Sequence, residues 1–239
     1  MIRPGENIFP LKSQAAEAFG AEHKSELLTI LFTDQVDSTR LQSELGNREA
    51  SRLTDLHRAI VHDQLAKYDA RAIEWAGDSC LAVFAKPSDA VVFALKLQAA
   101  LRRARADEAR LPRLRIGLHV GEIVVRQHDD ASKKEDLFGL QVSETARVMS
   151  LARADQIYCT RPVFDNARSV LRNESIEGVG NVLWKNYGPF ELKGSEEPAE
   201  ICEVGEEGLA PLLPPEANDK CAPIKGDIEK WRRRRAKGG

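Results

Sequence analysis

The chain lacks a long apolar run and any closely spaced pair of cysteines, and each absence excludes a class of protein. No stretch approaches the roughly 20 apolar residues that cross a bilayer, and the opening MIRPGENIFPLK lacks the apolar centre of a secretory signal. The four cysteines, which lie far apart, are Cys80, Cys159, Cys202 and Cys221. Without a CxxC pair they argue against structural zinc and fit a reducing compartment. We therefore expect a cytoplasmic protein with no membrane span.

An excess of either charge is also missing. The sequence has 35 Lys and Arg against 37 Asp and Glu. This balance argues neither for nor against a nucleic-acid partner, and we expect none. The 239 residues, of which 42% are hydrophobic, can form one good-sized domain with appendages or two small domains. We expect an N-terminal lead-in over residues 1–26, a compact domain over 27–204, and a proline-containing, basic C-terminal tail over 205–239.

The stretch AIEWAGDSCLAVF, residues 72–84, predicts a β-hairpin. Its two short apolar runs are joined across Gly77 and Asp78, and Gly beside Asp favours a tight turn because both tolerate positive φ. Side chains alternate along a strand, so Glu74 and Asp78 share one face while Trp75 lies on the other, which we expect to be buried. Two carboxylates on one face are costly unless solvent, a cation or a ligand meets them. A solvated turn and a ligand site are both open at this point.

A second acidic position ends an apolar strand. The run Leu27–Asp34 is apolar on both faces, so it should lie in the middle of a sheet. Asp37-Ser38-Thr39 then supplies N-cap residues for a helix over Arg40–Leu45, which ends at Gly46. A carboxylate beside the free amides of a helix N-terminus can hold a metal ion and a phosphate together. A buried strand followed by an ordinary cap is the alternative.

The remaining pattern alternates helices and strands, and it indicates an α+β fold with a mixed sheet covered by helices. We expect further helices over 47–67, from Pro87, from Gly139 and over 162–171. We expect further strands over 114–125 (a pair kinked at Gly121), over 156–159, and as an edge hairpin of 190–194 and 199–204. His57 and His62 are five residues apart, which is not a metal-ligand spacing on a helix, so we interpret both as structural.

Five motifs taken together resemble the catalytic domain of class III nucleotidyl cyclases. In chain order they are LFTDQVDST, AGDS, RIGLHVGE, DLFGLQVSETAR and LKG, and they extend over roughly Leu27 to Val204. The resemblance implies a ferredoxin-like fold and active sites at the interface of a head-to-tail homodimer. It also implies a metal-dependent lyase that converts a nucleoside triphosphate into a 3′,5′-cyclic nucleotide and pyrophosphate.

The resemblance also assigns roles to individual residues. Asp34 and Asp78 match the acids that bind two Mg²⁺ or Mn²⁺ ions, and Gln35 adjoins them in that site. The phosphate-binding residues it implies are Asp37, Ser38, Thr39 and, by a weaker match, Lys193. Arg147 matches the arginine that stabilises the transition state, and its guanidinium fork suits phosphate oxygens. Ser143 stands where the family has an asparagine that orients the ribose.

The base-recognition positions depart from both known codes of the family. Adenylyl cyclases have a lysine at the position of Glu74 and an aspartate at that of Asp136, whereas guanylyl cyclases pair a glutamate with a cysteine. Two carboxylates only accept hydrogen bonds, so they favour guanine, cytosine or uracil edges over adenine N1. We expect a pyrimidine substrate, with UTP ahead of CTP. An adenylyl or guanylyl cyclase with an atypical base code, or a degenerate cyclase that only binds nucleotide or a partner, is the alternative.

The layout of a cyclase domain without a receptor or membrane module resembles the pyrimidine cyclases of Pycsar anti-phage systems. In those systems the cyclic nucleotide activates a separate effector. That resemblance implies second-messenger synthesis in antiviral defence.

Overall fold

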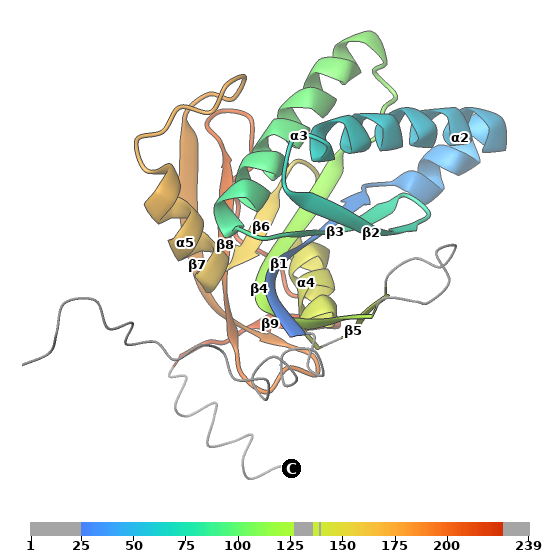
Figure 1. Cartoon of the computed structure of the whole chain (residues 1–239). Coiled ribbons are helices and arrows are strands. Elements are labelled where there is room, and N and C mark those ends of the chain that lie inside the picture. Colours follow the sequence, from blue (N-terminus) through green and yellow to red (C-terminus); the bar gives the residue numbers. More distant parts are fainter. Residues whose placement is uncertain (1–24, 127–135, 139, 227–239) are drawn as a thin grey trace, which may run out of the picture.

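The computed structural model describes residues 25–126, 136–138 and 140–226 (Figure 1). The strands are β1 (Ser25–Gln35), β2 (Ala70–Ala76), β3 (Ser79–Phe84), β4 (Leu114–Arg126), β5 (Asp136–Phe138), β6 (Ile157–Thr160), β7 (Val182–Leu192), β8 (Ala199–Glu206) and β9 (Cys221–Pro223). The helices are α2 (Ser38–Leu65), α3 (Pro87–Asp107), α4 (Leu140–Leu151) and α5 (Arg161–Leu171). In these three ranges no helix has the length and apolar character needed to cross a membrane.

The strands form one mixed sheet in the order β2-β3-β1-β4-β6-β8-β7-β9, and β5 pairs with β4 beside this path. β4 and β6 run parallel, whereas the neighbours β1 and β4 run antiparallel. The expected α+β fold with a mixed sheet covered by helices is confirmed. The expected hairpin is confirmed too, since β2 and β3 pair antiparallel across a turn at Gly77, whose φ is 62°.

The core explains why β1 is apolar on both of its faces. Leu31 packs in a large cluster with Phe93 of α3 and Phe164 of α5. Ile30, which points to the opposite face, packs in a separate cluster with Leu81 and Val83 of β3. β1 therefore lies in the interior of the sheet, as its sequence predicts, and α4 packs on the face opposite to α3 and α5 (Figure 1).

One expectation about β4 is wrong. β4 is a single strand of 13 residues that continues through Gly121, not a pair of strands kinked there. A Cβ on Gly121 would lie 2.6 Å from the Gln141 side chain, and one on Gly117 would lie 2.4 Å from the backbone nitrogen of Met149. Both glycines thus allow close packing of α4 on β4, and neither makes a turn.

The expected hairpin of 190–194 and 199–204 is confirmed, since β7 and β8 pair antiparallel, but its expected place at the edge of the sheet is wrong. β7 begins at Val182, and β8 lies in the interior of the sheet between β6 and β7. β9 then pairs with β7, so the segment after Gly205 contributes to the sheet. The boundaries of the lead-in, domain and tail stay predictions, and the run KWRRRR lies outside the described residues.

Buried Glu203 of β8 holds the segment after Gly205 against the sheet. Its carboxylate accepts hydrogen bonds from the Tyr187 hydroxyl at 2.7 Å and from the backbone N–H of Leu212 at 3.2 Å. The hydroxyl of Tyr158 donates to the carbonyl of Leu213 at 2.7 Å. These contacts to backbone groups fix a proline-containing stretch that has no regular secondary structure.

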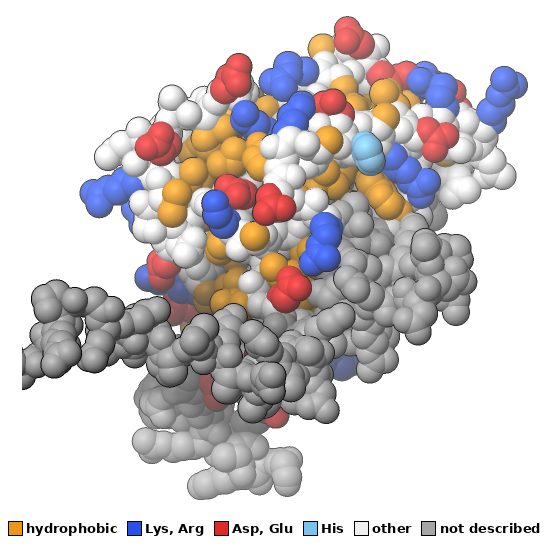
Figure 2. Space-filling view, viewed as in Figure 1, with side chains coloured by type: hydrophobic (Ala, Val, Ile, Leu, Met, Phe, Trp, Pro, Cys, Tyr) orange, Lys and Arg blue, Asp and Glu red, His pale blue; other side chains and the backbone are white. Residues whose placement is uncertain are grey.

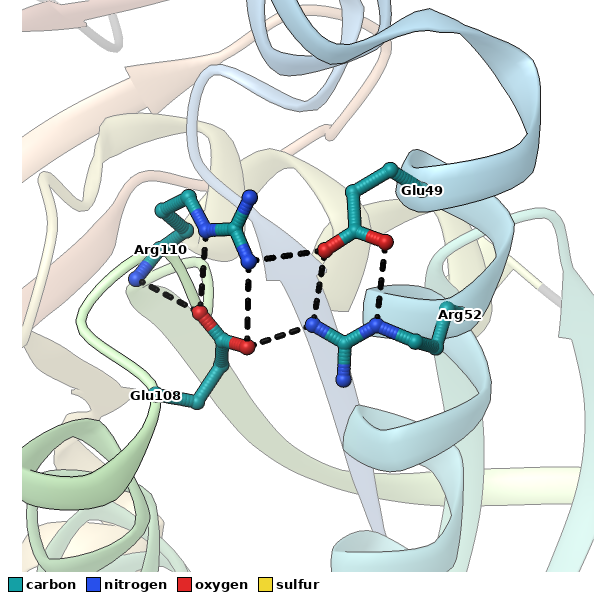
Figure 3. Close-up of polar contacts among 4 residues, drawn as sticks. All are labelled: Glu49, Arg52, Glu108 and Arg110. Atoms are coloured by element: carbon teal, nitrogen blue, oxygen red, sulfur yellow. Dashed lines mark hydrogen bonds and ion pairs between the residues drawn. The ribbon is translucent and has the colours of Figure 1, made fainter.

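Helix α2 is divided at Gly46, whose φ of 76° and ψ of 165° are not helical. This confirms the predicted helix end at that residue, because only glycine adopts such a conformation freely. After Gly46, four charged side chains connect α2 with the stretch between α3 and β4 (Figure 3). Arg110 donates to Glu49 at 2.8 Å and to Glu108 at 3.1 Å, and Arg52 contacts both acids.

Candidate active site

Asp34 lies near the end of β1 on the sheet face that α4 covers, and both of its carboxylate oxygens have partners. The Ser79 hydroxyl donates to Oδ1 at 2.7 Å. Arg115 stands directly opposite Asp34 in the β1–β4 register, and its Nε and a terminal nitrogen donate to Oδ2 at 2.9 and 2.5 Å. The antiparallel pairing of β1 and β4 therefore fixes the orientation of this carboxylate.

Asp78 lies at the tip of the β2–β3 hairpin, where an arginine of α2 holds the turn. A terminal nitrogen of Arg58 donates to the carbonyl of Gly77. The guanidinium carbon lies 5.7 Å from the centre of the Trp75 ring, a distance typical of a cation–π contact. Trp75 itself packs against the main core, as expected from strand alternation. Arg58 thus joins the helix, the aromatic ring and the turn that carries Asp78.

A polar cavity of about 430 Å³ lies between α2 and the hairpin tip. Three buried polar atoms of its lining residues have no hydrogen-bond partner among the described residues: Gln35 Nε2, Arg58 Nε and Asp78 Oδ2. Buried polar groups are normally paired, so these donors and this acceptor point to a polar guest in the cavity. The other lining residues are mostly hydroxyl, amide or acidic side chains from α2, among them Ser38, Thr39, Gln42, Asn47, Ser51, Thr54 and Asp55.

The two acids suit a divalent cation. Carboxylate oxygens are the ligands that Mg²⁺ and Mn²⁺ prefer, and Mg²⁺ is usually held by one or two carboxylates together with substrate phosphates. Oδ2 of Asp78 is buried and has no hydrogen-bond partner among the described residues, whereas Asp34 would share its carboxylate with Arg115 and Ser79. Among the described residues no group of three or more His, Cys, Asp or Glu side chains could hold a metal ion.

The predicted phosphate-binding loop precedes α2 directly. Asp37 is the N-cap residue, with a left-handed φ of 64°, and its side chain makes no capping hydrogen bond. Its exposed carboxylate lies 3.9 Å from the Arg40 guanidinium instead. The backbone N–H of Val36 donates to the carbonyl of Arg113 at 2.9 Å, so this amide is not free for a phosphate. The first-turn amides of Ser38 and Thr39 are the ones a helix N-terminus offers to an anion.

Arg147 belongs to a second cluster, formed by α4 and the β7–β8 turn. A terminal nitrogen of its guanidinium lies 3.4 Å from where a Cβ on Gly194 would stand, and Lys193 is the preceding residue. The other terminal nitrogen is buried without a partner among the described residues. Ser143 lies one turn earlier on α4, and it is exposed. The structure thus brings Arg147 to the LKG motif, and no hydrogen bond or ion pair between described residues joins it to Asp34.

The two predicted base-recognition residues are described only by their backbone. Glu74 pairs with Leu81 of β3 just after an irregularity in the β2–β3 register, and Asp136 pairs with Arg126 of β4. Their side chains lie outside what the structure describes, so their role in base recognition stays a prediction.

Sequence reasoning missed two arginines of the site. Arg115 begins the RIGLHVGE motif, but its partner Asp34 is 81 residues away and only the strand register joins them. Arg58 reaches Gly77 across 19 residues. The sequence signal that could have indicated Arg58 is its place on the helix predicted over 47–67, directly before the predicted hairpin.

A family comparison decides the relationship of the chain. The model of the adenylate and guanylate cyclase catalytic domain matches residues 21–200. The chain belongs to this cyclase family. The resemblance indicated by the five motifs is therefore confirmed at the level of the family.

The relatives of this cyclase domain are distant and mostly longer. The serine/threonine-protein kinase pkn2 of Myxococcus xanthus is 24% identical over 233 residues, which cover 89% of this chain and 26% of the relative. The putative adenylate cyclase 3 of Rhizobium meliloti is 26% identical over 180 residues, which cover 74% of this chain and 28% of the relative. The chain thus spans little more than a quarter of the length of either protein.

Solved cyclase structures share the fold. The adenylyl cyclase CyaB from P. aeruginosa aligns with a TM-score of 0.65 at 17% identity, covering 79% of this chain and 97% of that one. The guanylyl cyclase Cya2 aligns with a TM-score of 0.62 at 21% identity, covering 79% and 98%. At these identities the likeness shows the fold of the cyclase domain and leaves its substrate open.

Proposed function

We propose that this cyclase domain is an active, metal-dependent enzyme that converts a nucleoside triphosphate into its 3′,5′-cyclic monophosphate and pyrophosphate. The observation that carries the proposal is the pair of acids: Asp78 lines the polar cavity, and Asp34 accepts a hydrogen bond from Ser79, the residue after Asp78. A domain that only bound a partner would not need the Asp78 carboxylate at this cavity, whereas Asp34 also pairs with Arg115.

In the proposed reaction the 3′-oxygen of the ribose forms a bond to the α-phosphorus, and the bond from that phosphorus to the pyrophosphate oxygen breaks. Bound Mg²⁺ or Mn²⁺ would lower the pKa of the 3′-hydroxyl and offset charge on the phosphates. Asp34 and Asp78 would hold these ions, and the first turn of α2 would bind phosphate oxygens. Arg147 would stabilise the charge that develops during transfer, since its buried terminal nitrogen has no partner among the described residues and can donate strongly to oxygen.

We further propose that the enzyme acts as a homodimer. The acids and Arg147 lie in separate clusters of one chain, so a site that uses both would take them from two chains in head-to-tail arrangement. The product would act on a separate effector in a cytoplasmic signalling role, with anti-phage defence as the proposed context.

A pyrimidine is the proposed substrate, with UTP ahead of CTP, because Glu74 and Asp136 are both acceptors. Adenylyl or guanylyl activity is the second candidate, and the family description and the named adenylate cyclase relative favour it. Both candidates use the same acids and differ only in the base.

Incubation with ATP, GTP, CTP and UTP at equal concentrations with Mn²⁺, followed by mass spectrometry, tests the proposal. We expect cyclic UMP as the main product and cyclic CMP next. Asp78→Asn, which removes one metal-binding charge, should give none, while Asp63→Asn on the exposed surface of α2 serves as the matched control. A purine product alone would refute the pyrimidine preference, and no cyclic product from any nucleotide would refute the enzymatic proposal.

A further inference from the structure

Lys193 and Lys220 lie on neighbouring backbone segments at one edge of the sheet. Lys220 belongs to the segment after residue 200, which lies beyond the region matched by the family model. Cys221 of β9 pairs with Leu192 of β7 in an antiparallel register. One position further, the backbone N–H of Lys193 donates to the carbonyl of Lys220 at 2.8 Å. Lys220 and Lys193 therefore stand opposite each other across the two strands, and both are exposed.

Like charges directly opposite each other in an antiparallel pair are destabilising, and their Cβ atoms are typically about 5 Å apart. An anion that both ammonium groups contact would remove this repulsion. The two lysines line a cavity of about 290 Å³ together with Gly194 and Asn218. The only carboxylates among its described lining residues are those of Glu191 and Asp219.

A third cation lies beside the same turn. Arg147 places one terminal nitrogen 3.4 Å from the Cβ position of Gly194 and leaves the other buried without a described partner. The pKa of the Cys221 thiol is influenced by the charges around this turn. Burial raises the pKa of that thiol, and the charge of Asp219 adds to the rise, while the hydrogen bond with Ser150 and the charges of Arg147 and Lys220 oppose it.

We propose that Lys220 binds the polyphosphate of the nucleotide together with Lys193 and Arg147, so that the C-terminal segment supplies a residue of the active site. Two lysines that line one small cavity, with Arg147 beside the same turn, fit a compact, multiply charged anion better than an extended acidic chain. Ammonium groups contribute point charges, and the guanidinium contributes a planar pair of donors. The proposal rests on the proposed function for the identity of the nucleotide, but not for the presence of the anion site.

Calorimetric titration with inorganic tripolyphosphate tests the site without turnover. Lys220→Ala should raise the Kd for tripolyphosphate about tenfold, while Lys220→Arg, which keeps the charge, should change it little. Lys225→Ala is the matched control, because Lys225 is exposed in the same segment and does not line the cavity. No variant should melt below the wild type, since the β7–β9 contact at this position uses the Lys220 backbone and not its side chain. Lys220→Ala also removes a like charge opposite Lys193, so it should melt at the wild-type temperature or slightly above it.

Cyclase assays on the same variants separate the two proposals. With the preferred nucleotide, Lys220→Ala should raise KM by a similar factor and leave kcat nearly unchanged, as expected for loss of binding equal in the ground and transition states. If tripolyphosphate binds wild type and Lys220→Ala equally, the inference is overturned even if the enzyme is active. If the wild type forms no cyclic nucleotide but Lys220→Ala still weakens tripolyphosphate binding, the anion site is supported and the proposed function fails.

Discussion

Arg115 and Asp34 face each other across β1 and β4, and two nitrogens of the guanidinium donate to the same carboxylate oxygen at 2.9 and 2.5 Å. One acid therefore has two tasks in the proposed enzyme. It would bind a metal ion, and it already pairs a half-buried guanidinium. Any substitution of Asp34 will affect stability as well as activity.

We predict that Asp34→Ala abolishes turnover and also lowers the free energy of unfolding by about 1–3 kcal/mol, because Arg115 loses its partner. Asp34→Asn keeps a carbonyl acceptor for Arg115, so it should be equally inactive but lose less stability. Urea denaturation and turnover at saturating Mn²⁺ measure the two effects. Near-wild-type turnover of either variant would rule out Asp34 as a metal ligand.

The proposed shared site predicts complementation between two inactive variants. Asp78→Ala and Arg147→Ala should each be inactive, but a mixture should regain at most about a quarter of wild-type activity, because half the dimers are mixed and each holds one intact site. Turnover of the mixture after subunit exchange is the measurement. Exchange shown by a mass-tagged chain without any recovery would contradict a site formed by two chains.

The proposed base code predicts a switch in substrate. Glu74→Lys would provide a donor for adenine N1 while Asp136 accepts from N6, so ATP use should rise roughly ten- to hundredfold relative to pyrimidines. Competition between equimolar nucleotides gives the ratio of products directly. An unchanged ratio would mean that Glu74 does not contact the base.

Arg58 is predicted to position the turn that carries Asp78. Arg58→Met removes the hydrogen bond to the Gly77 carbonyl and should reduce turnover about ten- to hundredfold. It should also weaken Mn²⁺ binding, measured by electron paramagnetic resonance, whereas Arg58→Lys should recover part of both. Arg52→Met on the same helix, which loses only the exposed contacts of Figure 3, is the control. Equal effects of the two methionine variants would indicate a general defect of α2.

His57 predicts a specific acid sensitivity. Burial lowers its pKa from 6.5 to about 4, with the Asp78 charge opposing the shift and the Arg58 charge adding to it. Between pH 6.5 and 4, His57 is protonated in the unfolded chain and neutral in the folded chain. The free energy of unfolding therefore falls by about 3 kcal/mol as the pH drops from 6.5 to 4. Urea denaturation at several pH values should show that His57→Leu lacks this loss. Parallel pH profiles for the two proteins would contradict the prediction.

Local patterns were enough to predict the hairpin, the central strand β1 and the helix end at Gly46, because turn residues and apolar periodicity determine them. The start of β7 was not predictable in this way. Gly188 and Pro189 interrupt its pattern, and a register irregularity between Asn186 and Pro189 accommodates them in the sheet. The glycines inside β4 suggested a kink. Their actual role is to allow Gln141 and Met149 of α4 to approach β4 closely, and this packing cannot be predicted from the sequence of the strand alone.

The residues of the candidate site also fall into two groups, those that local sequence motifs indicate and those that only the tertiary structure brings together. Asp34, Asp78 and Arg147 could be named as candidates from the sequence, because each lies in a motif with a recognisable order along the chain, and their roles stay predictions. Arg115 required the register of two strands, and Lys220 required the return of a segment whose prolines suggested a tail. Contacts of this kind depend on tertiary structure, which spacing along the sequence does not encode.

On the face shown in Figure 2, acidic and basic side chains are interspersed over the described surface. No extended basic patch stands out among the described side chains on that face. The cations around Lys193 would act at short range, so we expect binding to depend on local contacts more than on long-range steering.

The β7–β9 pairing also determines how open one edge of the sheet is to pairing with other chains. β9 is three residues long and includes Pro223, which has no N–H to donate. Very short edge strands that contain proline resist the addition of a strand from another chain, and such strand addition is the first step in forming many aggregates. β9 pairs with only the last three residues of the eleven-residue strand β7, Phe190 to Leu192, so it covers that end of the edge. The same short strand that positions Lys220 thus blocks strand addition at this end of β7.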